Sequence, residues 1–434
     1  MRSRAQRLRT TLALTAALGL ALTASACGRF GGAQPEQTSG SLNVWVVAQD
    51  GQLTQSFEAA SKGFADSSGI QVKVTGYQND QFKQNIANAT GTDAMPDVFI
   101  NWSGIGLIGN IYESGTLQDM DSAYTKYSWD PRFNKAAVST ATIDGKKYGV
   151  PYVINEMAVV YKKSTMQKAG ITEMPTTYDG LLALNDKLLS KGVTPFSFAG
   201  KQPWNLMRLT DSLLETKCGS QTFDDLRNLK ADWTTTPCAE QGFAELDRWI
   251  SKGYLTKNFM ALDPNANQMY TPIVDGKAAM TIDGNWSGPS LKALKQNPDD
   301  YSFFVFPTDT QRLSYFTSSW WVNGKGKNVD NASRYVDYMT QQNTVSQNTT
   351  MLQGAISGTL GVAPPATATT YDKAWFPLSE KYTGVYLPSD QAFVPDVAQS
   401  YLRNQDKLAL GQQSPAKTAA AIQSDAKVYL DQKK

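Results

Sequence analysis

Short apolar runs alternate with amphipathic stretches from residue 41 onward. Residues 42–47 form an apolar run of strand length, and residues 53–64 then carry apolar side chains at helical spacing. The same succession returns over 70–74 and 82–89, and a third apolar run follows at 98–100. Strands that alternate with helices of these lengths predict a parallel α/β sheet.

Polar side chains follow two of these predicted strands. Gln49 and Asp50 come after the first, and Asn101, Trp102 and Ser103 come after the third. Ligands of open α/β sheets bind beyond the carboxyl ends of the strands. We therefore expect Asp50, Asn101 and Trp102 to face a ligand.

A segment too apolar for a surface strand covers residues 148–163, after the turn signal Asp144-Gly145. Its composition predicts a strand that is buried on both faces. Asn155 and Glu156 interrupt it, and buried polar groups need partners. Either the two side chains are hydrogen-bonded at a strand end, or they face a ligand in a cleft.

Length and charge narrow the class of protein. At 434 residues the chain exceeds the size of a single core, so two domains are expected. The net charge of +2 gives no strong field for nucleic acid or an anionic membrane. The chain contains no histidine, which excludes Ser-His-Asp triads, Cys-His pairs and histidine metal sites.

The amino-terminal segment has the pattern of an export signal. Four arginines precede an apolar run over 11–23, and small residues lead to Cys27. This pattern resembles a bacterial lipobox and implies a signal peptide over 1–26, a lipidated Cys27 and a flexible tether over 27–40. An ordinary secretory signal with an incidental cysteine is the alternative.

Two further cysteines, Cys218 and Cys238, remain after Cys27. In an exported protein an even pair favours a disulfide, which would stabilise the fold by on the order of 3 kcal/mol. Metal binding by two thiols without histidine is the weaker alternative.

Several motifs occur in an order typical of one family. They are Met95-Pro96-Asp97, Tyr148-Gly149-Val150-Pro151-Tyr152, Met174-Pro175-Thr176, Gln202-Pro203-Trp204 and the strand with Gly284 and Trp286. Together they resemble the family 1 extracellular solute-binding proteins, the carbohydrate receptors of ABC importers that include the maltose-binding protein group. The chain departs from that pattern at Trp320-Trp321, where the family usually has Gly-Gly.

The resemblance implies a two-lobed periplasmic-binding-protein-like α/β fold. Each lobe would hold a mostly parallel sheet flanked by helices, and several crossovers would form the hinge. Residues 41–152 with 297–325 would make lobe 1, and residues 153–296 with 326–434 would make lobe 2. The implied partners are a carbohydrate ligand, ABC permease subunits and, through Cys27, the outer face of the cell membrane. We expect a monomer with no cofactor, no metal and no enzymatic activity.

A sugar offers flat apolar faces and a rim of hydroxyls, so its receptor needs aromatic rings surrounded by polar groups. The candidate aromatic rings are Trp102, Tyr152, Trp204, Trp286 and Trp320, with Trp321 as the alternative to Trp320 because adjacent strand residues face opposite ways. The candidate hydroxyl partners are Asp50, Asn101, Asn155 and Glu156.

Two other functions remain open. A glycoside hydrolase could use a carboxylate pair such as Glu156 and Asp283, because such enzymes need two carboxyl groups beside one glycosidic bond. A two-lobed receptor could instead bind a polyamine or a peptide.

Overall fold

The protein is described from a computed structural model that covers residues 40–48, 50–376, 378, 381–382 and 384–433. The expected signal peptide over 1–26, the lipidation at Cys27 and nearly all of the tether lie outside the described residues. Within the described ranges, no helix is long and apolar enough to cross a membrane.

A ten-stranded mixed sheet organises the described chain. Its strands are β1 (Ser41–Val47), β2 (Gln71–Tyr77), β3 (Val98–Trp102), β6 (Gly149–Lys162), β7 (Thr194–Phe196), β8 (Ala278–Gly284), β9 (Tyr301–Phe304), β10 (Arg312–Val322), β11 (Ile356–Ser357) and β12 (Gly384–Tyr386). The main path is β2-β1-β3-β10-β6-β8-β7, and β4 (Thr142–Ile143) and β5 (Lys146–Lys147) form a separate hairpin. The strands predicted over 42–47, 70–74 and 98–100 lie in β1, β2 and β3, which pair in parallel as expected.

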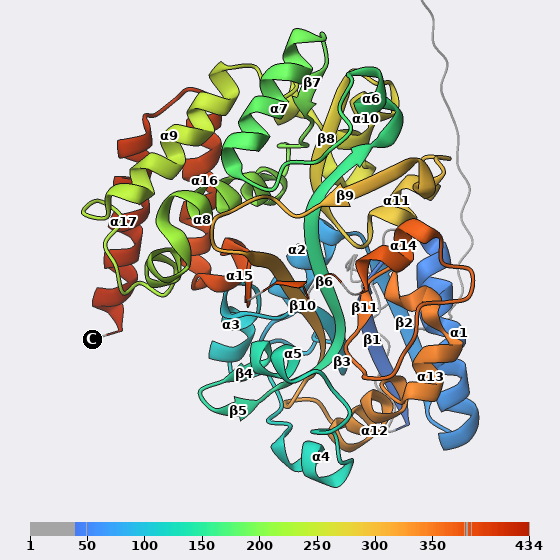
Figure 1. The fold of residues 1–434 in the computed structure, drawn as a ribbon. Helices are drawn as coiled ribbons and strands as arrows, with labels where there is room; N and C mark the ends of the chain where they lie inside the picture. Colours follow the sequence, from blue (N-terminus) through green and yellow to red (C-terminus); the bar gives the residue numbers. More distant parts are fainter. Residues whose placement is uncertain (1–39, 49, 377, 379–380, 383, 434) are drawn as a thin grey trace, which may run out of the picture. The chain divides into compact units, whose positions relative to one another are not determined.

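Strand β6 connects two lobes. Its first part pairs with β10 from Gly149 to Met157, and its second part pairs with β8 and β9 from Met157 to Lys162. Figure 1 shows β6 as a long green strand with β10 alongside its first part. The register between β6 and β10 shifts between Ser318 and Ser319, a β-bulge that locally bends and twists a strand.

The first lobe packs helices against β1, β2 and β3. Its helices are α1 (Gly51–Ser68), α2 (Asn79–Ala89), α3 (Ile105–Glu113), α4 (Asp121–Lys126), α5 (Lys135–Thr140), α12 (Val329–Met339) and α13 (Gln342–Gln347). Helix α1 buries Phe57 and Phe64 on the face that the sequence spacing predicts. These rings join Val44 and Tyr335 in one apolar core.

The second lobe surrounds β7, β8 and the end of β6 with helices. They are α6 (Lys163–Lys168), α7 (Tyr178–Ser190), α8 (Pro203–Arg227), α9 (Pro237–Ser251), α10 (Thr271–Val274), α11 (Ser287–Ala293), α14 (Thr370–Trp375), α15 (Ser389–Ala392), α16 (Pro395–Ala409) and α17 (Pro415–Gln432). Helix α17 begins at Pro415 after the Ser414 cap, whose side chain accepts a hydrogen bond from the Lys417 amide.

The lobe boundaries in the structure differ from the expected ones at two places. Residues 332–355, expected in lobe 2, contribute Tyr335, Val336 and Met351 to the core of lobe 1. Residues 301–306, expected in lobe 1, stay in lobe 2, because β9 pairs with the second part of β6. The chain returns to lobe 1 in β10, which follows residues 301–306 and pairs with β3 and the first part of β6. An apolar run over 303–306 does not itself reveal which sheet edge it joins.

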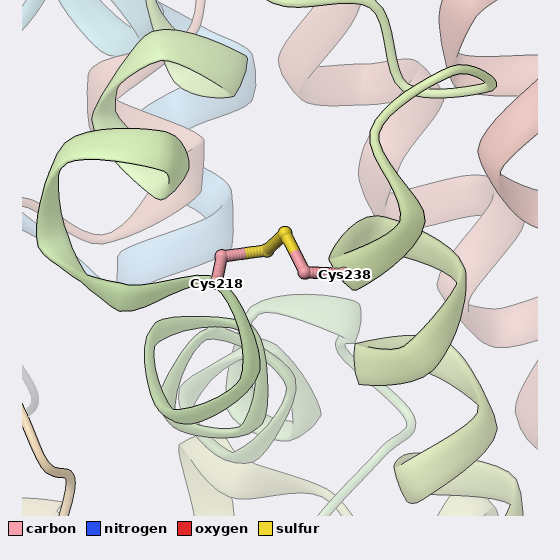
Figure 2. The surroundings of a disulfide bond; sticks show 2 residues. All are labelled: Cys218 and Cys238. Carbon is pink, nitrogen blue, oxygen red and sulfur yellow. A yellow bond between two sulfur atoms is a disulfide. The ribbon is translucent and has the colours of Figure 1, made fainter.

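The predicted disulfide between Cys218 and Cys238 is confirmed. It joins α8 to the first turn of α9 with an S–S distance of 2.01 Å (Figure 2). Helix α8 kinks directly after Cys218, where Gly219 adopts a φ of 71°. Glycine reaches this left-handed backbone region without the steric cost of a β-carbon.

Replacing both cysteines by serine should lower the free energy of unfolding by on the order of 3 kcal/mol, because the unfolded chain regains loop entropy. Denaturant unfolding measures this change. Wild-type protein treated with reductant should be destabilised similarly, whereas the double variant should not respond to reductant. Equal unfolding midpoints of oxidised wild type and variant would contradict the expectation.

Two carboxyl groups, the buried Asp211 of α8 and the partly buried Asp406 of α16, have raised pKa values. Asp211 accepts hydrogen bonds from the Ser389 amide and the Tyr401 hydroxyl, both at 2.8 Å. Burial nevertheless raises the pKa of Asp211 to about 6. Burial likewise raises the pKa of Asp406 in α16 to about 6. Both groups therefore hold protons more tightly in the folded chain than in the unfolded one.

Their contribution to stability is present below the unfolded-state pKa of about 4 and is lost as the pH rises towards 6. The melting temperature of Asp406→Asn, minus that of wild type, should therefore increase between about pH 4 and pH 6.5 and then level off. Thermal unfolding across buffers measures this difference. Asp66→Asn, at an exposed side chain of α1, is the control. A constant difference for Asp406→Asn would contradict the assignment.

Candidate functional site

A cavity of about 680 Å³ lies between loops of the two lobes. Most of the side chains expected to bind a ligand line it, namely Asp50, Asn101, Trp102, Tyr152, Asn155, Trp204 and Trp286. The crossing strands also line it, through Phe316 and Ser318 of β10. The structure thus brings together loops that are far apart in sequence.

The first lobe supplies the carboxyl ends of β1 and β3. Asp50 caps α1, since its Oδ1 accepts the Leu53 amide hydrogen at 2.9 Å. Asn101 is buried, and its amide group donates to the Leu107 carbonyl at 3.2 Å. Its Oδ1 accepts the Trp102 amide hydrogen at 2.9 Å. Both side chains therefore shape the loops that carry them, in addition to lining the cavity.

Trp102 is half-buried at the end of β3. The edge of its ring meets Phe82 of α2 with centroids 6.3 Å apart. Lys83 Nζ lies 5.0 Å from the Trp102 ring centre and 5.7 Å from that of Trp204. Lys83 belongs to lobe 1 and Trp204 to lobe 2, so this ammonium group joins the two sides of the cavity by cation–π contacts.

The second lobe is organised around Arg208 of α8. Its guanidinium forms an ion pair with Asp283 at 2.7 Å and donates to the Ile282 carbonyl at 3.1 Å. The Tyr270 hydroxyl donates to the other oxygen of Asp283 at 2.7 Å, and burial raises the pKa of Tyr270. Buried charges need such partners. The guanidinium is thereby fixed 5.0 Å from the Trp204 ring centre and 5.2 Å from that of Trp286.

Trp286 follows β8 and lies over its last residue, Gly284. A β-carbon on Gly284 would come within 2.0 Å of the Trp286 ring, so only glycine leaves room for it. Phe316 of β10 supports the ring, with centroids 5.5 Å apart. The half-buried Trp286 lines the cavity. Its expected position facing the cleft agrees with this geometry.

Tyr152 lines the cavity mainly as part of its wall. Its hydroxyl donates to the Met351 carbonyl, and its ring packs against Phe57 and Trp320 with centroids 5.9 and 5.4 Å away. A ring held on these sides leaves little flat surface for stacking. Tyr152 therefore differs from the half-buried tryptophans.

The structure does not support Trp320 as a ligand-binding ring. Its side chain is only 1% exposed and packs in the lobe 1 core, against Phe57 and Tyr335. Trp321 is buried on the opposite face of β10, where its Nε1 donates to the Asn101 carbonyl at 3.1 Å. Successive strand residues point to opposite faces, and here both faces of the sheet are covered.

Glu156 is fully buried and does not line the cavity, although its neighbour Asn155 does. The alternation of side chains along β6 explains this difference. Asp283 is fully buried in its ion pair and is likewise not a lining residue. The two carboxylates considered for a hydrolase therefore do not flank the cavity.

Further polar residues that the sequence did not indicate also line the cavity, among them Lys83, Arg208, Asp390 and Gln391. Trp204 and Arg208 are one helical turn apart on α8, a spacing that could have indicated a shared face. No comparable pattern marks Asp390 and Gln391, because α15 has only four residues.

The sequence of the chain is similar to those of known binding proteins. Residues 50–343 match the sequence profile described as bacterial extracellular solute-binding protein. A probable sugar-binding periplasmic protein of Rhizobium meliloti is 29% identical over 201 residues, 45% of this chain and 46% of that protein. The chain thus matches about half the length of that relative and of a similarly described Brucella melitensis protein. A maltodextrin-binding protein of Bacillus subtilis is 24% identical over 76% of each chain.

Solved structures share the fold at low identity. A chitin oligosaccharide binding protein superposes with a TM-score of 0.78 at 20% identity, over 89% of this chain and 98% of that one. A bacterial solute receptor described as preferring β-D-galactopyranose gives a TM-score of 0.78 at 21% identity, over 91% and 99% of the two chains. With the family profile matching most of the chain, the protein belongs to the bacterial extracellular solute-binding protein family.

Proposed function

We propose that the protein is the receptor of an ABC sugar importer. It captures a sugar or oligosaccharide in the cavity between its lobes and delivers it to the permease. The observation that carries the proposal is one cavity lined by three half-buried tryptophans, Trp102, Trp204 and Trp286, together with amide and carboxylate groups. Tryptophan rings match the apolar faces of sugar rings, and the polar groups match the hydroxyls.

The names of the relatives support the same ligand class. The Rhizobium meliloti and Bacillus subtilis proteins are named for sugar and maltodextrin binding. A Streptococcus pneumoniae relative, 25% identical over 76% of this chain, is named a maltooligosaccharide ABC transporter solute-binding lipoprotein. The proposal extends to Cys27 as the site of lipidation, to an extracytoplasmic monomer at the cell membrane, and to binding without catalysis.

A polyamine or cationic peptide fits the cavity less well. The ammonium of Lys83 and the guanidinium of Arg208 already lie over the Trp102, Trp204 and Trp286 rings. A cationic ligand would be repelled by these groups while competing for the same ring faces. The carboxylate pair considered for a hydrolase is disfavoured because neither Glu156 nor Asp283 lines the cavity.

Thermal unfolding with added ligand tests the ligand class. The probes are D-galactose, raffinose, stachyose, maltodextrin and chitin oligosaccharides, with spermidine as the cationic comparison. A ligand that binds only the folded state at 100 times its Kd stabilises that state by about 2.7 kcal/mol. We expect at least one sugar to raise the melting temperature and spermidine to leave it unchanged. A rise with spermidine alone would overturn the proposal.

Trp286→Ala should weaken binding of the responding sugar by roughly 1–3 kcal/mol, since it removes a stacking surface at the cavity. Gly284→Ala should act in the same direction, because its new methyl group would displace the Trp286 ring. Isothermal calorimetry measures both changes.

Gly384→Ala is the matched control, since a β-carbon there meets only Arg312 at an ordinary distance of 3.6 Å. It should bind sugar as wild type does. Unchanged affinity in Trp286→Ala, together with a sharp loss of thermal stability, would show that Trp286 only packs.

A further inference from the structure

One end of the cavity holds buried polar atoms that lack partners. Asp390 Oδ1, Gln391 Oε1 and Trp204 Nε1 are each buried without a hydrogen-bond partner among the described residues. Asp390 is 8% exposed and Gln391 4%, and all three residues line the cavity. A buried polar group without a partner costs about 1–3 kcal/mol, so three of them on residues that line one cavity need an explanation.

The backbone around Asp390 and Gln391 is held firmly. The Ser389 amide donates to Asp211 at 2.8 Å, and the Asp390 amide donates to Met207 Sδ at 3.3 Å. These two bonds attach α15 to α8. The side chains of α15 therefore cannot easily move away to find other partners.

The other side of α15 packs closely against the start of α3. A β-carbon on Gly104 would lie 2.6 Å from the Gln391 carbonyl oxygen, and one on Gly106 would lie 2.1 Å from that of Asp390. The backbone of α15 thus presses against the start of α3. These contacts hold α15 between α3 and α8, where Asp390 and Gln391 line the cavity.

The charged groups around Asp390 limit which ligands this part of the cavity can bind. Burial raises the pKa of Asp390, and attraction by Lys83 and Arg208 opposes that rise. An anionic ligand would meet the Asp390 carboxylate, and a cationic ligand would meet the two basic side chains. An ionised carboxylate only accepts hydrogen bonds, so its partner has to be a donor. Neutral hydroxyl groups satisfy all of these conditions.

We propose that Asp390 and Gln391 form the hydroxyl-binding end of the cavity and select for neutral sugars. The Asp390 carboxylate and Gln391 Oε1 accept hydrogen bonds from sugar hydroxyls, and Trp204 Nε1 donates to a sugar oxygen. The choice of sugar as ligand class rests on the proposed function. The open acceptors themselves rest on the packing of α15 and do not depend on it.

Asp390→Asn tests the proposal, because it removes the charge and keeps the shape. Affinity for the responding sugar among D-galactose, raffinose, stachyose, maltodextrin and chitin oligosaccharides should fall about 10-fold to 100-fold, as for a lost charge-assisted hydrogen bond. The melting temperature of the sugar-free protein should rise at neutral pH, since a buried carboxylate whose Oδ1 has no hydrogen-bond donor among the described residues has been replaced by a neutral group. Gln391→Leu should also weaken binding without lowering stability.

Asp406→Asn is the matched control. Asp406 is another carboxyl whose pKa burial raises, and it is not a lining residue. Its variant should raise the melting temperature and leave sugar affinity unchanged. Wild-type affinity in Asp390→Asn would overturn the proposal, as would a lower melting temperature of that variant without sugar.

The two proposals fail in different ways. If wild type binds none of the five sugars, the proposed function fails for this panel. The melting temperature of sugar-free Asp390→Asn then still decides about the site. A rise upholds the unsatisfied Oδ1 of Asp390 and refutes only the sugar, whereas a fall refutes both.

Discussion

The pairing of β6 with β10 is the constraint on which the rest of the structure depends. These two strands run side by side from lobe 1 into lobe 2 and keep one sheet continuous through both. The cavity is lined at this crossing by Asn155 of β6 and by Phe316 and Ser318 of β10. The register shift at Ser318 falls in the same place. The loops that line the cavity therefore keep their relative positions through a hydrogen-bonded ladder that also lines it.

Within the second lobe, the Arg208–Asp283 ion pair holds side chains in place, as the β6–β10 ladder holds the backbone. Removing two charges from water is costly, and such pairs contribute little net stability. The Tyr270 hydroxyl and the Ile282 carbonyl complete the bonding of this pair. The cationic plane that results contacts both Trp204 and Trp286. The value of the pair lies in fixing two aromatic rings that belong to different elements.

The spacing of apolar positions predicted the strands and helices. It did not predict which face of a strand each side chain points to, or which distant segments come into contact. Alternating strands and helices located β1 to β3, and their carboxyl ends located Asp50 and Trp102, because parallel strands place these ends at one edge. Trp320 and Glu156 were assigned to the cavity wrongly, since each lies in a strand that is buried on both faces and only the structure gives the phase. The sequence did not predict Asp390 and Gln391, because a helix of four residues is too short to show a periodic pattern of apolar positions.

Asp211 and Asp390 show how differently one region of the fold uses buried carboxylates. Both are nine-tenths buried or more, and both are linked to Ser389, one by a hydrogen bond and the other by the chain. Asp211 has two donors from the protein and holds α15 in place. The Oδ1 of Asp390 has no such donor among the described residues. Folding alone favours filling such a position with an apolar side chain, so a carboxylate there is best explained by donors that arrive with a ligand.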